Sequence, residues 1–228
     1  MTTTYYKVLN TDGTCYHGGA GRWELGVRRS VMGRLVACEH AIHACTLEQL
    51  PTWLGPAIWE IALEDAEDAG DKTMARAGTL TRRIETWTDQ TARLFAADCA
   101  AHVLHLTKDA RCLEAVFAAR RYAFGLIDAA ARDAARGAAW AAAGAAARDA
   151  ARGAAWAAAG AAAGGAAWAA AGAAARGAAW AAAGDAAGAA ERAWQAARLG
   201  AYLRGEVDLA SYRNVVVRDM AAATEKKP

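Results

Sequence analysis

Proline and phenylalanine are scarce in this chain of 228 residues, with three of each, and neither sign of charge dominates. The 26 Lys and Arg residues almost cancel the 24 Asp and Glu residues, whereas dedicated nucleic-acid binders carry a clear basic excess. Disordered chains are rich in proline and poor in apolar residues, which make up 55% of this sequence. We therefore expect a folded protein of one or two domains that binds no nucleic acid.

A complete disulfide framework is excluded as well, because the five cysteines are an odd number. Residues 1–10 lack the basic segment and the following apolar run of a secretory signal. Reduced thiols are typical of the cytoplasm. The prediction is therefore a cytoplasmic protein with free cysteines, which are Cys15, Cys38, Cys45, Cys99 and Cys112.

Residues 129–190 lack every large aliphatic residue and consist only of Ala, Gly, Trp, Arg and Asp. The 16 residues of 129–144 recur unchanged as 145–160. Alanine has the best helix propensity, and the β-branched residues that favour strands are absent. The segment is therefore predicted to be helical, although each glycine costs about 1 kcal/mol relative to alanine.

Tryptophan, arginine and glycine recur in this repeat at multiples of four residues, which does not match the 3.6-residue turn of a helix. Because each step turns the marker position by about 40°, one straight helix would scatter its tryptophans. The Gly164–Gly165 pair predicts a break instead, with antiparallel helices over 129–163 and 166–204. We expect a thin, closely packed hairpin whose tryptophans fill gaps between layers. One long helix, or a tryptophan and arginine face that contacts a partner, are the alternatives.

The longest uncharged run, residues 153–175, is long enough to cross a bilayer. It contains no Leu, Ile, Val or Phe, and alanine and glycine provide little free energy of transfer into lipid. Membrane insertion is therefore not expected. Apolar surface left on the alanine-rich helices would permit a homodimer, and a structural role at a membrane surface is a further alternative for the repeat.

The residues before position 89 have the mixed pattern of a small β-rich domain. Thr46 as an N-cap predicts a short helix over 46–54. Residues 72–85 fit either a strand or a helix. Alternation and short apolar runs predict three strands, over 5–9, 35–37 and 57–63.

From residue 89 onward, apolar residues recur at helical spacing, and Thr88 is the predicted N-cap of the first helix. The last residues, 223–228, are predicted to be a flexible tail. The predicted fold class is therefore α+β. It has a small mixed β-rich domain over 1–88 and an all-α, alanine-rich hairpin or bundle over 89–222.

Two cysteines and two histidines lie within eight residues of the N-terminal domain, namely Cys38, His40, His43 and Cys45. Thiolates and imidazoles are zinc ligands, so the cluster is a candidate metal site with Cys15 and His17 as further ligands. The spacing matches no zinc finger, and buried core residues beside a turn are the alternative. The sequence has no phosphate-binding glycine loop, nucleophile elbow or HExxH motif.

A set of short motifs runs through the N-terminal half, over residues 6–10, 17–19, 43–45 and 53–60 and at Cys38. These motifs resemble a domain of unknown function found in bacterial and phage proteins. In that family a cysteine and a Gly-Phe-His-Ala-Cys or similar motif follow an opening Tyr-Lys strand. Members often carry repetitive C-terminal segments, as this chain does. The resemblance supplies no known catalytic residue.

The helical half has motifs at residues 93–100 and 191–195 and at Leu199, on either side of the alanine-rich tract. They resemble predicted immunity proteins of bacterial toxin–immunity systems. That resemblance implies an all-helical domain that binds a toxin and catalyses no reaction. The predicted function is therefore a non-catalytic, immunity-like binding module with a protein partner and no cofactor.

A second hypothesis concerns His43 and Glu60. A strand with a histidine, a short helix and an apolar strand that ends in a glutamate follow one another here. This order resembles that of compact ADP-ribosyltransferases, which implies that His43 and Glu60 are catalytic residues of an active or degenerate enzyme. Convergence of the two side chains in one pocket would favour this alternative.

Overall fold

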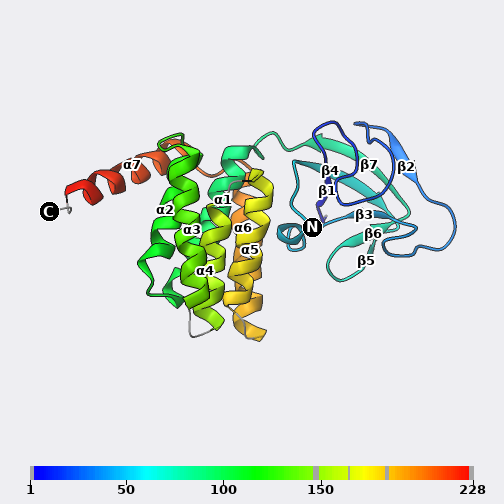
Figure 1. Cartoon of the computed structure of the whole chain (residues 1–228). Coiled ribbons are helices and arrows are strands. Elements are labelled where there is room, and N and C mark those ends of the chain that lie inside the picture. Colours follow the sequence, from blue (N-terminus) through cyan, green and yellow to red (C-terminus); the bar gives the residue numbers. More distant parts are fainter. Residues whose placement is uncertain (1–2, 146–148, 164, 183–184, 226–228) are drawn as a thin grey trace.

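The computed structural model describes residues 3–145, 149–163, 165–182 and 185–225. A β-rich domain formed by the first part of the chain lies beside a bundle of helices formed by the rest (Figure 1). The predicted α+β class, with strands first and helices after them, is confirmed.

Two antiparallel sheets make up the β-rich domain, with the orders β1-β4-β7-β2 and β3-β6-β5. The predicted strands over 5–9 and 57–63 are confirmed as β1 and β4, and the undecided residues 72–85 form β6 and β7. The bounds are β1 Tyr5–Leu9, β2 Arg28–Ser30, β3 Ile42–Ala44, β4 Ala57–Glu64, β5 Glu67–Asp68, β6 Thr73–Ala75 and β7 Ala77–Arg83.

Two predictions for this domain are wrong. Residues 35–37 form no strand, because the chain reverses at this point. Val36 and His40 exchange backbone hydrogen bonds of 3.1 and 2.8 Å across the turn. The helix predicted over 46–54 is only one 3-10 turn, η1 (Leu50–Thr52). The central proline of that turn has no N–H group with which to continue a helix.

The second domain begins with a well-capped helix. Thr88 caps α1 as predicted, because its Oγ1 accepts a hydrogen bond from the Thr91 N–H (3.2 Å) and Thr91 Oγ1 accepts one from the Thr88 N–H (2.8 Å). α1 is the central helix and contacts α2, α4, α5 and α6. The bounds are α1 Asp89–His102, η2 Leu104–Leu106, α2 Ala110–Ala123, α3 Ala129–Ala145, α4 Asp149–Ala161, α5 Ala167–Ala181, α6 Asp185–Leu203 and α7 Leu209–Glu225.

The predicted hairpin of two long helices over 129–163 and 166–204 is wrong. The repeat forms α3, α4, α5 and the start of α6, which are shorter helices packed against their neighbours in the chain. The expected break does separate α4, which ends at Ala161, from α5, which begins at Ala167, and Gly164 lies outside the described residues. Shorter helices can surround α1, whereas two long ones would leave most of their alanine surface in water.

The repeat is also not the thin extension that we expected, because its alanines form part of the main hydrophobic core. Its described alanines with 0% exposure lie on α3, on α4, on α5 and between α4 and α5. They are Ala139, Ala154, Ala157, Ala158, Ala162, Ala167, Ala171, Ala174 and Ala178. Alanine buries little area per residue, so many of them must be packed to build a core.

Glycine allows the close approach of α4 and α5. A Cβ atom on Gly177 would lie 2.8 Å from the backbone nitrogen of Ala157, and one on Gly153 would lie 2.7 Å from the Cα atom of Ala181. Such distances are shorter than van der Waals contact, so a larger residue at either position would push the two backbones apart. Tight packing thus explains glycines that weaken an isolated helix.

A single hydrophobic core joins the large sheet to the helices. Alternate residues of a strand face opposite sides of a sheet, and Tyr6 and Val8 of β1 pack with helical side chains such as Phe95. The opposite face of β1 belongs to a smaller core that comprises Leu9, Trp23, Ile42, Ala44, Ile61 and Leu80. The large sheet therefore lies between the smaller core on one face and the helical bundle on the other.

Hydrogen bonds also connect the two domains. Thr86 Oγ1 donates to the carbonyl oxygen of Leu203 at 2.7 Å. Trp168 Nε1, on α5, donates to the hydroxyl oxygen of Tyr16 at 2.9 Å. The 3-10 turn η1 contacts both α5 and α6. The second domain thus fixes the position of the loop that contains Tyr16.

A buried carboxylate ties four helices together. Asp98 on α1 accepts hydrogen bonds from Arg198 Nε (2.8 Å) and the Tyr202 hydroxyl (2.8 Å) on α6, and from Arg120 on α2 (3.2 Å). The Tyr212 hydroxyl of α7 donates to the same carboxylate. Burial raises the pKa of Tyr202 and Tyr212, so both remain protonated donors. Buried charge is stable only when it is paired in this way.

The C-terminal segment differs in part from the expected tail over 223–228, because α7 continues to Glu225. Residues 226–228 lie outside the described part of the chain. None of the helices in the described ranges is long and apolar enough to cross a membrane.

Candidate functional site

The N-terminal domain contains a cavity of about 260 Å³. It opens beside an isolated bridge between β1 and the residue that follows β3, where Tyr6 and Cys45 exchange two backbone hydrogen bonds of 2.8 Å. We call it the thiol cavity, because Cys15, Cys38 and Cys45 all line it. Two lysines, Lys7 and Lys72, and the aromatic rings of Tyr16, His17 and Trp53 also line it.

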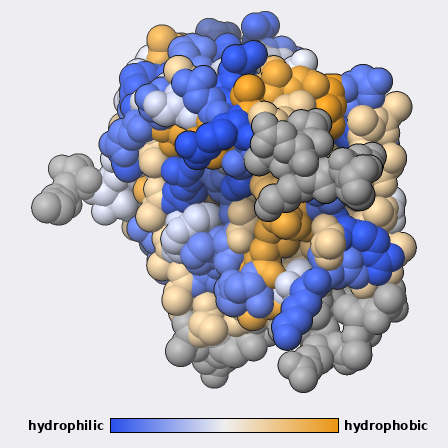
Figure 2. Space-filling model, turned by 90° about the vertical axis from the view of Figure 1, so that its left-hand side faces the viewer, coloured by the Kyte–Doolittle hydropathy of each residue, from blue (hydrophilic) through white to orange (hydrophobic). Residues whose placement is uncertain are grey.

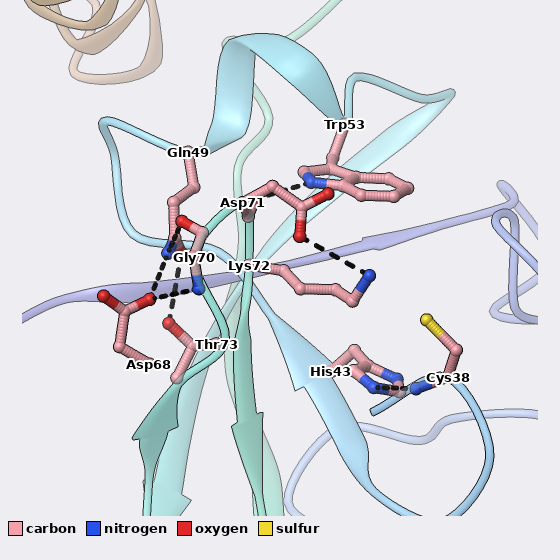
Figure 3. Close-up of polar contacts among 9 residues, drawn as sticks. All are labelled: Cys38, His43, Gln49, Trp53, Asp68, Gly70, Asp71, Lys72 and Thr73. Atoms are coloured by element: carbon pink, nitrogen blue, oxygen red, sulfur yellow. Dashed lines mark hydrogen bonds and ion pairs between the residues drawn. The ribbon is translucent and has the colours of Figure 1, made fainter. Parts of the chain in front are cut away.

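Lys72 lies on one wall of the thiol cavity, between an aromatic ring and a thiol (Figure 3). Its Nζ atom is 4.8 Å from the ring centroid of Trp53 and 3.6 Å from a carboxylate oxygen of Asp71. The neighbouring Cys38 side chain raises the pKa of Lys72. Trp53 is held in turn by its Nε1 atom, which donates to the Asp71 carbonyl oxygen at 2.7 Å. This wall is therefore built before any ligand arrives.

Cys38 and His43 face each other on the next part of the wall. The backbone N–H of Cys38 donates to His43 Nε2 at 3.1 Å, so the neutral ring carries its proton on Nδ1. Burial, followed by the charges of Lys7 and Lys72, lowers the pKa of His43, which favours that neutral ring. Cys38 has a φ of 66°, a left-handed conformation that costs a residue other than glycine about 1–2 kcal/mol. The turn thus holds the exposed Cys38 thiol at the cavity, although the backbone of Cys38 is strained.

Lys7 carries a charge with little compensation. Its Nζ atom donates one hydrogen bond, to the His43 carbonyl oxygen at 2.7 Å, and lies 5.1 Å from the ring centroid of Trp23. Removal from water lowers the pKa of Lys7. The neighbouring thiol of Cys45 is no counter-charge, because burial raises its pKa to about 12. Within the described residues, Lys7 has no ion-pair partner.

The cluster that the sequence suggested as a metal site is only partly brought together. Cys38, His43 and Cys45 line the thiol cavity, whereas His40 does not, and its Nε2 atom forms a hydrogen bond with the Met32 carbonyl oxygen. In the ranges that the structure describes, no group of three or more His, Cys, Asp or Glu side chains could hold a metal ion. The geometry therefore gives no support to a metal centre here.

His43 and Glu60, the residues of the enzyme hypothesis, lie in different surroundings. His43 lines the thiol cavity, but Glu60 on β4 is not part of the lining. Both carboxylate oxygens of Glu60 accept hydrogen bonds from Arg82 on β7, at 2.5 and 3.1 Å. The structure therefore does not place the Glu60 carboxylate in the lining of the cavity that His43 lines.

A second candidate site lies on the helical repeat, where α3, α4 and α5 each contribute one exposed tryptophan. Trp140, Trp156 and Trp180 are 50, 40 and 38% exposed. The ring centroids of Trp140 and Trp156 are 6.3 Å apart, and those of Trp156 and Trp180 are stacked at 4.8 Å. The rings line a hollow of about 460 Å³ together with Arg136 and Arg176. We call this surface the tryptophan groove.

The expectation that repeat tryptophans fill gaps between layers fits Trp168, the fourth tryptophan of the repeat. Its side chain is half-buried and donates a hydrogen bond to Tyr16. The three tryptophans of the groove instead form the aromatic and arginine face that we gave as the alternative. The sequence could not distinguish the two groups, since their local surroundings are almost the same.

Other apolar surface is more divided. On the side of the molecule formed by α2 and α7, hydrophobic areas lie among hydrophilic side chains (Figure 2). The exposed large apolar residues of these helices include Leu113, Val215 and Val217. Singly exposed aliphatic residues are normal on protein surfaces. The stacked rings of the tryptophan groove are not.

Sequence reasoning missed Lys7 and Lys72 as site residues. For Lys7 a signal was present, because alternation puts it on the same face of β1 as Leu9, which is completely buried. A lysine on a buried strand face requires a partner or a cavity. For Lys72 there was no such signal, since Trp53 and Cys38 approach it only through the tertiary fold.

No protein-family model matches the chain, and neither a curated protein nor a solved structure gives a significant match. The resemblances to the domain of unknown function and to immunity proteins therefore stay predictions.

Proposed function

We propose that this protein is a non-catalytic binding module whose tryptophan groove receives an acidic segment of a partner protein. The exposure of three neighbouring tryptophans is the observation that carries this proposal. Tryptophan and arginine are enriched among the residues that contribute most to protein–protein affinity. Removal of water-exposed indole rings from water by a partner is favourable.

The charge of the groove favours an acidic partner. Arg136 and Arg176 are exposed and line the hollow, and neither has a carboxylate partner among the residues that the structure describes. The described lining contains no Asp or Glu. An acidic segment with an apolar side chain would satisfy both the guanidinium groups and the rings. The resemblance to immunity proteins suggests a toxin as that partner.

The groove is also preformed. Trp156 stacks on Trp180, and these residues lie on α4 and α5, which pack closely through glycine. The entropic cost of ordering this surface when a partner binds should therefore be small.

The test is a titration of the purified product of the neighbouring gene, with intrinsic tryptophan fluorescence as the readout. We expect the Trp156→Ala variant to raise the Kd roughly 30-fold or more, as is typical for a residue at the centre of an interface. Replacing Arg136 and Arg176 by glutamate should weaken binding and reduce its salt dependence. Arg213→Glu is the matched control, because Arg213 is exposed on α7, away from the groove.

Unchanged affinity of the Trp156→Ala variant would reject the groove as the binding surface, and absence of binding to the neighbouring product would count against the function itself. A dimer in sedimentation experiments that Trp156→Ala dissociates would assign the groove to a second copy of the chain. Equal binding of anionic vesicles or single-stranded DNA would indicate a lipid or nucleic-acid surface instead.

A further inference from the structure

The thiol cavity has the features of a ligand site that is separate from the tryptophan groove. We propose that it binds a small organic anion, whose carboxylate or phosphate group lies between the ammonium groups of Lys7 and Lys72. Failure of this proposal would leave the function of the groove untouched, because the two sites share no lining residue.

Lys7 provides one cation of the cavity. An ammonium group has three N–H donors, and the structure gives the one on Lys7 a single hydrogen bond, to the His43 carbonyl oxygen. The Trp23 ring contributes a cation–π contact but no negative charge. A desolvated cation without a counter-ion is costly, and an anion in the cavity would supply both the missing charge and the missing acceptors.

Lys72 provides a second cation on the same cavity. Its side chain is 14% exposed, and its only ion pair in the described structure is a 3.6 Å approach to Asp71, which is 56% exposed. That distance is too long for a strong hydrogen bond, so Lys72 keeps donors for a ligand. Among the described lining residues Glu39 is the one acid, and it is exposed. The lining therefore has a positive balance.

The remaining walls favour an organic molecule over a bare inorganic ion. The ring centroids of His17 and Trp53 are 5.2 Å apart in an edge-to-face arrangement, and Tyr16 packs on His17 at 4.6 Å. The Tyr16 oxygen accepts from Trp168, which leaves its own proton to donate to a ligand. A cavity of about 260 Å³ lies just below the range of roughly 300–1,000 Å³ typical of drug-sized ligands. The ligand is therefore small.

The experiment measures binding of four compounds to the whole chain by thermal shift: acetate, inorganic phosphate, adenosine 5′-monophosphate and uncharged adenosine. We expect at least one anion to raise the Tm at concentrations up to about 10 mM. Comparison of acetate with inorganic phosphate identifies whether the cavity recognises a carboxylate or a phosphate group. Adenosine, which lacks the anionic group, should bind at least tenfold more weakly than its monophosphate.

Lys7→Met is the decisive variant, since it keeps an apolar stem and removes a charge that has no ion-pair partner among the described residues. It should fold with an unchanged or higher Tm and raise the Kd for the anion at least tenfold. Lys108→Met, at an exposed position outside the cavity, is the matched control and should bind as the unaltered chain does.

Protection of a thiol gives a second readout that requires no substitution. Cys38 lines the cavity and is the exposed cysteine of the chain. A bound anion should therefore slow its reaction with a disulfide reagent. The proposal is overturned if none of the three anions shifts the Tm or protects Cys38, if adenosine acts as well as its monophosphate, or if Lys7→Met binds within twofold of the unaltered chain.

Discussion

Replacing two glycines of the repeat by alanine should have opposite effects on stability. Gly137 on α3 is exposed, and a Cβ atom added there would have no neighbour within 4 Å. Gly177 on α5 faces α4, where the same atom would lie 2.8 Å from the nitrogen and 2.9 Å from the Cα atom of Ala157. Both positions lie inside a helix, so intrinsic helix propensity favours alanine at each.

The size of the two effects follows from these contacts. Gly137→Ala should raise the free energy of unfolding by up to about 1 kcal/mol, the difference in helix propensity between the two residues. Gly177→Ala has the same gain, but overpacking typically costs about 1–3 kcal/mol. The upper part of that range applies here, because the obstacle is backbone and cannot rotate away. We expect a net loss of about 1–2 kcal/mol.

Chemical denaturation followed by circular dichroism measures both variants directly. In a chain of this size, 1 kcal/mol corresponds to a Tm change of about 2–4 °C, so the variants should lie on opposite sides of the unaltered chain. Equal stabilisation by the two substitutions would refute the close approach of α4 and α5. Equal destabilisation would refute the exposed helical position of Gly137.

Three further predictions concern the helical core and the thiols. Asp98→Asn should lower the free energy of unfolding by about 3–5 kcal/mol, because it leaves two partly buried guanidinium groups without their buried carboxylate. Asp133→Asn, at a half-exposed ion pair, should change it by less than about 1 kcal/mol. Similar values for both variants would contradict the network around Asp98. Since burial raises the pKa of Tyr202 and Tyr212, the native state retains protons that the unfolded state releases above its ordinary value of 10.0. Stability should therefore be complete below pH 10 and fall as the pH rises further, and a flat profile in alkaline denaturation experiments would contradict this. In the native protein Cys38 should react with a thiol reagent and the buried cysteines only upon unfolding, as mass spectrometry of the labelled peptides would reveal.

Local signals account for the part of the fold that the sequence predicted. The alternation of β1, the Thr88 cap and the break before α5 each depend on residues that are neighbours in the chain. The division of the repeat into shorter helices depends on how alanine faces pack around α1, and the repeat itself looks almost the same at every position. The Asp98 network was also beyond prediction, because its partners lie 22 to 114 positions away.

The candidate sites show the same limit. Cys38, His43 and Cys45 were recognised as a cluster, and they do share a cavity, yet His40 points elsewhere because the chain reverses at Val36. The groove tryptophans are 16 and 24 positions apart in a repeat that contains a fourth tryptophan, Trp168, of almost the same local character. Only the packing of α3, α4 and α5 brings them side by side.

The hydrogen bond between Tyr16 and Trp168 gives the two sites a common element. Tyr16 lines the thiol cavity, while Trp168 lies on α5, the helix that carries Trp180 of the groove. A ligand that moved the Tyr16 hydroxyl would weaken its hydrogen bond with Trp168 and so change the stability of α5 in its present position. The affinity of the groove for a partner would change with it. Thermodynamic linkage then requires that a partner in the groove alter the affinity of the cavity by the same factor. A ligand bound in one domain would therefore be detectable as a changed affinity in the other.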